Sequence, residues 1–107
     1  MNYPSQNRSF HAVMPVAHRS AAWFSHVLEL EAKMTQSAFG YEYAVMHWDE
    51  APEGVREYYV TQIEFHRNNY ISARQTLKKV APEKIESLEK KIAHQKTLLL
   101  QGNRVIH

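Results

Sequence analysis

The chain has 107 residues and a formal net charge of +2, with no cysteine and three glycines. These numbers exclude a disulfide framework, a thiolate metal site, a cysteine nucleophile and a glycine-rich phosphate loop. The apolar fraction of 44% exceeds that of disordered chains, and no apolar run approaches the ~20 residues of a membrane span. The first ten residues lack a basic segment followed by an apolar stretch. We therefore expect one domain that stays in the cytoplasm.

Prolines divide the chain into long proline-free segments. Proline is tolerated in the first turn of a helix and excluded from its interior, so Pro15, Pro52 and Pro82 are expected to start helices. A glutamate follows each of the last two prolines, where the helix dipole favours a carboxylate. Gly102 is typical of a helix end. The helices expected from these signals cover residues 16–50, 53–80 and 82–101.

Hydrophobic periodicity supports the same division. In each segment, mostly apolar residues recur at steps of four and three, which place them along one stripe of a helix, here called its seam. The first seam contains Trp23, Val27, Leu30, Met34, Ser37, Tyr41, Ala44 and Trp48. The second contains Val55, Tyr59, Ile63, His66, Tyr70, Ala73, Leu77 and Val80. The third contains Ile85, Leu88, Ile92, Gln95 and Leu99. This 3.5-residue repeat predicts an all-α fold, an antiparallel coiled-coil-like bundle of three long helices.

One feature qualifies this architecture. Gly40 costs ~1 kcal/mol relative to alanine inside a helix, and a break there would give four helices. We expect the helix to continue, because the seam keeps its phase across Gly40. The expected organisation is an N-terminal arm at 1–16, a helical bundle domain at 17–102 and a C-terminal tail at 103–107.

The expected lengths leave one end of the hairpin uncovered. At 1.5 Å per residue the first helix would run ~50 Å and the third only ~30 Å. The uncovered end, here called the aromatic tip, contains Tyr41, Tyr43, Val45, Met46, Trp48, Tyr58 and Tyr59. Such a composition is typical of an interface core, and a symmetric dimer is its commonest outcome. The residues expected to form this interface are Tyr41, Val45, Trp48, Tyr58 and Tyr59. The alternative is that the arm, or the tail with Val105 and Ile106, folds over the tip.

Three polar residues, Ser37, His66 and Gln95, occupy seam positions. The short connections predict that they lie at one level of the bundle. Buried polar groups need hydrogen-bond partners, so these three would bond one another. The first interpretation is a polar layer that fixes the helix register. The second is a small-ligand or proton site beside Gly40.

No catalytic or metal-binding motif is present. Neither Glu-x-x-His nor His-Glu-x-x-His occurs, and no serine lies in a G-x-S-x-G sequence. His26 with Glu29, and His47 with Glu50, would each supply only two ligands. A Ser37–His66 pair would lack an orienting acid. We therefore expect no enzyme activity, no metal and no cofactor.

Charge is unevenly distributed. Residues 1–65 have four Lys/Arg and eight Asp/Glu, a net charge of −4, whereas residues 66–107 have nine and three, a net charge of +6. The basic half favours a nucleic-acid hypothesis with contacts from Arg74, Lys78, Lys90 and Lys91. One alternative is a solvated lysine-rich face, with Lys90 paired to Glu86. Another is contact with an acidic protein partner, or head-to-tail contact with the acidic half of another copy.

The leading hypothesis from the sequence is a non-enzymatic protein–protein interaction module that self-associates, as a dimer, through the aromatic tip. The second hypothesis is a nucleic-acid-associated regulator that uses the basic half.

Overall fold

The structure is a computed structural model that describes residues 19–106, with side chains described as far as Gln101. Its elements are α2 (Ala21–Glu50), α3 (Glu53–Val80), the short 3₁₀ helix η2 (Pro82–Lys84) and α4 (Ile85–Ile106). The described residues contain three long helices packed together and no strand, so the all-α prediction is confirmed. The expected arm at 1–16, with Pro15, and the side chains of Val105 and Ile106 lie outside the described part.

Helix α2 begins at Ala21, later than the start expected near residue 16. Ser20 is its N-cap, and the Ser20 hydroxyl accepts a hydrogen bond of 3.2 Å from the backbone N–H of Trp23. A serine at this position satisfies one of the unpaired amides of the first turn. The helix continues through Gly40 to Glu50, so the hairpin has one long first helix and no break at the glycine.

The turn at Ala51 and Pro52 joins α2 to α3, which spans the predicted range 53–80. Pro52 supplies the carbonyl that accepts the first helical bond, 2.9 Å from the Val55 amide. The Arg56 guanidinium closes the same turn by donating to the Ala51 carbonyl at 3.1 Å. Proline and glutamate therefore start this helix as the sequence predicts.

The last helix differs from its prediction at both ends. Pro82 opens the 3₁₀ turn, and α4 proper begins at Ile85. The helix then continues through Gly102 to Ile106, whereas an end at 101 was expected. Gly102 does not end the helix, and no glycine of the described residues has a positive φ.

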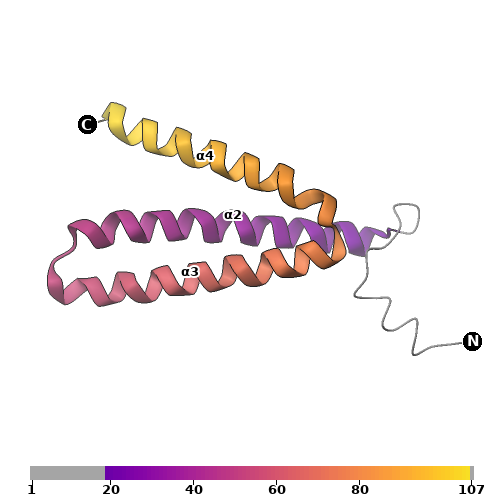
Figure 1. The fold of residues 1–107 in the computed structure, drawn as a ribbon, viewed down its shortest axis with the longest axis horizontal. Helices are drawn as coiled ribbons and strands as arrows, with labels where there is room; N and C mark the ends of the chain where they lie inside the picture. The colour runs from indigo at the N-terminus through magenta and orange to yellow at the C-terminus, as the bar shows by residue number, and fades with distance from the viewer. Residues whose placement is uncertain (1–18, 107) are drawn as a thin grey trace, which may run out of the picture.

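The hydrophobic core lies at the end of the hairpin where α4 joins it (Figure 1). Met34 and Leu77 are fully buried there. The Trp23 indole N–H donates to the Val80 carbonyl at 3.1 Å and so fixes the register of α2 on α3. The core consists of Trp23, Val27, Leu30, Met34, Ala38, Ala73, Leu77, Ala81, Ile85, Leu88 and Ile92.

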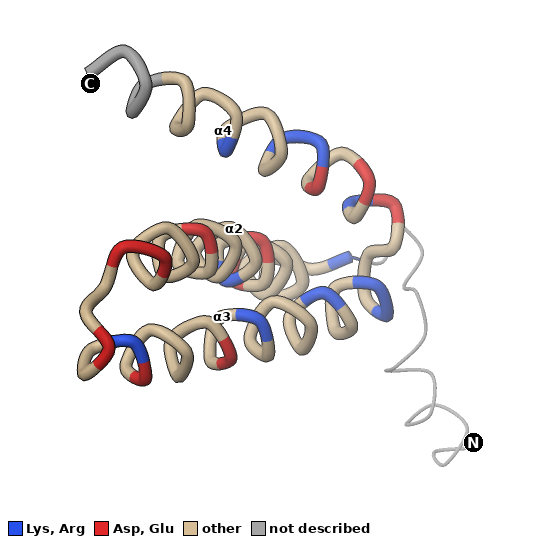
Figure 2. Tube along the Cα trace, turned by 60° about the vertical axis from the view of Figure 1, so that its left-hand side comes forward, with Lys and Arg blue, Asp and Glu red and all other residues tan. Residues whose placement is uncertain are grey.

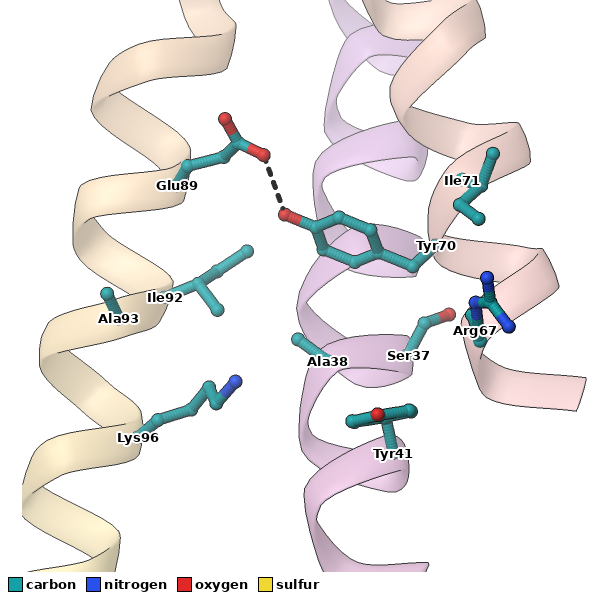
Figure 3. A pocket seen from close by; sticks show the side chains of 10 residues that line it. All are labelled: Ser37, Ala38, Tyr41, Arg67, Tyr70, Ile71, Glu89, Ile92, Ala93 and Lys96. Atoms are coloured by element: carbon teal, nitrogen blue, oxygen red, sulfur yellow. Dashed lines mark hydrogen bonds between the residues drawn. The ribbon is translucent and has the colours of Figure 1, made fainter. Parts of the chain in front are cut away.

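Helix α4 diverges from the α2–α3 hairpin toward its C-terminal end (Figure 1). Its first seam residues, from Ile85 to Ile92, are buried, whereas Leu98 and Leu99 are 53% and 43% exposed. The small buried residues Ala73 and Ala81 allow close approach at the base. Farther along, the Tyr70 ring extends from α3 toward α4 (Figure 3), and a side chain of that size keeps the helices apart. The divergence leaves the aromatic tip uncovered.

Candidate functional site

Aromatic rings form a continuous cluster across α2 and α3 at the tip. The ring centroids of Tyr43 and His47 are 4.0 Å apart, and those of His47 and Tyr59 are 5.9 Å apart. Tyr58 meets Tyr59 edge to face at 5.2 Å. These spacings lie within or just below the range of favourable aromatic pairs, so the cluster is a packed surface built from both helices.

The tip keeps much of its apolar surface exposed. Tyr43 and Tyr58 are 59% and 60% exposed, and Trp48 is 36% exposed beneath the Arg56 guanidinium, which lies 5.3 Å from the ring centroid. Val45 and Tyr59 are half-buried. Of the residues predicted for the interface, the structure places Trp48, Tyr58 and Tyr59 around the turn, whereas Tyr41 is half-buried and lines a pocket against α4.

A groove of about 460 Å³ adjoins this cluster and is here called the aromatic groove. Leu99 reaches it from α4, so all three helices contribute to it. His66 lies in its floor, where the imidazole contacts the backbone at Gly40. Its lining residues are Phe39, Gly40, Tyr43, Ala44, Tyr58, Tyr59, Gln62, His66 and Leu99.

The three residues of the expected polar layer lie in different surroundings. His66 lines the aromatic groove, Ser37 is buried beside a second pocket, and Gln95 is half-buried on α4. Within residues 19–101 no hydrogen bond joins any two of them. Because Gly40 has no side chain, the His66 ring fits against α2 nearly one turn beyond Ser37, and the two polar groups face different cavities.

The second pocket, here called the interhelical pocket, has a volume of about 380 Å³ and lies between α4 and the hairpin (Figure 3). Its walls combine four apolar side chains with hydroxyl, cationic and carboxylate groups. The lining residues are Ser37, Ala38, Tyr41, Arg67, Tyr70, Ile71, Glu89, Ile92, Ala93 and Lys96. Only Ser37 and Tyr41 among them were candidate site residues from the sequence.

Glu89 links α4 to α3 at the edge of this pocket. Its carboxylate accepts bonds from Arg74 at 2.8 and 3.3 Å and from the Tyr70 hydroxyl at 2.9 Å. The Arg74 bonds hold the pKa of Glu89 below its ordinary value. Burial, with the bond to Glu89, raises the pKa of Tyr70 to about 12. Both Glu89 oxygens are thus already hydrogen-bonded within the protein.

The basic residues proposed for nucleic-acid contact are interleaved with carboxylates. Arg74 is paired with Glu89 at 2.8 Å, and Lys90 with Glu86 at 3.1 Å. Arg74, Lys78 and Lys90 line one open groove of about 590 Å³ together with both glutamates, whereas Lys91 does not line it. Figure 2 shows acidic residues among the basic ones on α4. The surface therefore presents mixed charge to a phosphate backbone.

Within residues 19–106, no three His, Asp or Glu side chains are grouped so as to hold a metal ion. No described helix is both long enough and apolar enough to cross a bilayer. Comparison with protein-family models, with curated proteins and with solved structures gives no match to this chain.

Proposed function

We propose that the protein is a non-enzymatic, cytoplasmic helical module that acts by surface binding and forms a homodimer through its aromatic tip. The observation that carries this proposal is the exposure of Tyr43, Tyr58 and Trp48 beside the aromatic groove. Aromatic residues are enriched at interface cores and at the positions that contribute most to binding. An uncovered patch of this kind is typical of a protein–protein interaction site.

The partner surface in this proposal is α4 of the second copy. Its C-terminal half exposes Leu98, and Leu99 beyond its contact with the groove of its own copy, so it supplies an apolar face for the groove of the other copy. An amphipathic helix in an apolar groove is a common recognition mode. Placed against the hairpin of the other copy, this helix would complete the antiparallel coiled-coil packing that the three seams predict.

Charge complementarity favours a second copy as the occupant. Residues 41–57 have five acidic side chains, Glu42, Asp49, Glu50, Glu53 and Glu57, against the single Arg56. Figure 2 shows acidic residues at the turn that joins α2 to α3. Lysines on α4 have the opposite sign, and Lys96 already lies 3.5 Å from Glu42 within one copy. Opposite potentials steer association and fix its orientation.

Nucleic-acid binding receives no comparable support. Because Glu86 and Glu89 share the groove with Arg74, Lys78 and Lys90, the two carboxylates would repel the phosphates that the cations attract.

The test is molar mass in solution by light scattering, with Tyr58→Ala as the variant and Leu28→Ala as its control. Leu28 is 64% exposed, close to the 60% of Tyr58, but lies toward the opposite end of the hairpin. We expect a wild-type dimer that persists at high salt, a dimer in Leu28→Ala and a monomer of unchanged helicity in Tyr58→Ala. A wild-type monomer at all accessible concentrations would overturn the proposal.

A further inference from the structure

The interhelical pocket gathers hydrogen-bond donors that the protein leaves without acceptors. Ser37, Tyr41 and Arg67 line it, and within the described residues none of their side chains has a hydrogen-bond or ion-pair partner. Lys96 also lines it and has only a 3.5 Å contact with Glu42. Figure 3 shows the Lys96 side chain extending from α4 toward α2. The pocket therefore contains three donor groups that are unpaired in the described part of the chain, the Ser37 and Tyr41 hydroxyls and the Arg67 guanidinium, beside the Lys96 cation that is ion-paired with Glu42.

Among these donors, Ser37 gives the strongest evidence for a ligand. It is only 4% exposed and is the one buried polar residue in the described part. In the described part, every side-chain oxygen that is fully enclosed has a hydrogen-bond partner. The Ser37 oxygen has none, so it is not fully enclosed, and we take the interhelical pocket to be the space that it faces. In Figure 3 the hydroxyl points from α2 toward α3, on the side of Arg67. A buried hydroxyl without a protein partner costs stability unless water or a ligand bonds it.

Glu89 is the only carboxylate in the lining. Arg74 donates to both of its oxygens, and the Tyr70 hydroxyl donates to one of them. It therefore offers little to the unpaired donors across the pocket. The unpaired donors of Ser37, Tyr41 and Arg67 therefore need an acceptor from outside the chain, and a small anion can supply one.

The rest of the wall is apolar. Ala38, Ile71, Ile92 and Ala93 line it, and Ile92 points from α4 toward α2 (Figure 3). A volume of about 380 Å³ is within the range of small-molecule sites. Apolar walls with a few convergent polar groups are the usual composition of such sites. The ligand that matches both parts has one anionic group and a short apolar tail.

We propose that the interhelical pocket binds a small monocarboxylate with an apolar tail. The carboxylate accepts bonds from Arg67 and Ser37, with Lys96 adding a second positive charge. The tail lies along Ile92 and Ala93. This site is separate from the aromatic groove, and the proposal does not depend on dimer formation.

The probe is sodium octanoate, titrated into the full-length protein and followed by amide chemical shifts and by calorimetry. Octan-1-ol has the same tail without the charge, and inorganic phosphate has charge without a tail. We expect octanoate to saturate with a dissociation constant near or below about 1 mM, a reasonable value for about ten non-hydrogen atoms. The shifts should centre on residues 37, 67 and 92, and both comparison compounds should bind at least tenfold more weakly.

Two variants test separately the contribution of the Arg67 charge and that of the pocket volume. Arg67→Gln removes the unpaired guanidinium and should weaken octanoate binding about tenfold, because charge-assisted bonds are the strong ones. Lys79→Gln removes an exposed cation from the same helix outside the pocket and should change nothing. Ala93→Leu fills the pocket from an exposed position of α4 and should abolish binding while circular dichroism stays unchanged.

Three results would overturn the proposal. They are equal binding of octanoate and octan-1-ol, unchanged affinity in Arg67→Gln, or phosphate binding as tight as octanoate. The first would mean apolar adsorption, and the last would mean a simple anion site. A monomer that still binds octanoate would contradict only the proposed dimer.

Discussion

The imidazole of His66 occupies the space that a β-carbon on Gly40 would fill. A β-carbon at position 40 would lie 2.5–2.6 Å from three atoms of that ring, well inside van der Waals contact. The glycine therefore allows α3 to place a ring directly on the backbone of α2. This contact explains why a residue that costs ~1 kcal/mol in a helix interior is accommodated midway along a 30-residue helix.

The first prediction is a coupling between these two positions. Gly40→Ala alone should give little or no stabilisation, because the gain in helix propensity is offset by displacement of the His66 ring. In a His66→Ala background the same change should stabilise the fold by about 1 kcal/mol. Urea unfolding of the four proteins in the double-mutant cycle measures the difference.

Gly54→Ala is the matched control for that cycle. A β-carbon at position 54 would meet nothing within 4 Å, so its effect should be the same in the wild-type and His66→Ala backgrounds. Equal stabilisation by Gly40→Ala in both backgrounds would show that the ring contact has no energetic consequence.

The second prediction concerns Glu89, whose pKa is lowered chiefly by the bonds from Arg74. A carboxylate with a lowered pKa in the folded state contributes stability above its unfolded pKa of ~4.3. That contribution is lost as the pH falls through the lower, folded value. The pair is more than a third exposed, so solvent screening limits the effect to ~1 kcal/mol.

Glu89→Gln should therefore lower the free energy of unfolding at pH 7 and flatten its decline between pH 5 and 3. Tyr70→Phe removes a weaker bond that also lowers the pKa of Glu89 but leaves the Arg74 ion pair, so it should keep most of the acid dependence of the wild type. Denaturant unfolding at several pH values makes the comparison. If the free energy of unfolding of Glu89→Gln declined between pH 5 and 3 as steeply as that of the wild type, the decline would come from other carboxylates.

Helix positions and seam phases could be predicted from the sequence, because apolar periodicity and proline placement are local signals. Helix 53–80 matches its prediction, and the bond from Trp23 to Val80 joins its end to the start of the first helix. The divergence of α4 was not predicted. Periodicity identifies which face of a helix is apolar, but the angle between two helices depends on side-chain volumes at the contact, here alanines at the base and Tyr70 farther along.

The site was predicted only in part for a related reason. Exposed rings at the tip were expected from unequal helix lengths, but in the structure the divergence of α4, which continues to Ile106, is what leaves them uncovered. The interhelical pocket depends on that divergence and on long-range pairs such as Glu89 with Arg74. Such pairs, like the unpaired state of Arg67, depend on side-chain positions across two helices, which apolar periodicity does not determine.

The third prediction tests the base of the hairpin. Trp23→Phe keeps a ring in the core but removes the indole N–H that donates to the Val80 carbonyl. Losing that bond should cost about 1 to 2 kcal/mol of unfolding free energy. Phe24→Leu, at a neighbouring residue that is 50% exposed, should cost much less. Similar losses in thermal or urea unfolding for both variants would mean that the bond contributes no more than surface packing.

The fourth prediction is a gradient of amide exchange along α4. Amides near Leu88 and Ile92, whose side chains are buried, should be protected nearly as well as those of α3, because their exchange requires opening of the core. Amides from Leu98 to Gln101 should exchange much faster, because Leu98 and Leu99 are exposed and few apolar contacts hold this end to the hairpin. Hydrogen exchange followed by mass spectrometry resolves the two segments.

Hydrogen exchange measured at increasing protein concentration also tests the proposed dimer. If α4 of one copy packs on the tip of another, protection at residues 98–101 and around Tyr58 should rise together as the dimer forms, while residues 85–92 stay unchanged. Tyr58→Ala should remove this concentration dependence, and Leu28→Ala should retain it. A rise in protection confined to residues 21–30 would instead place the contact between copies at the base of the hairpin, where Phe24 and Leu28 are exposed.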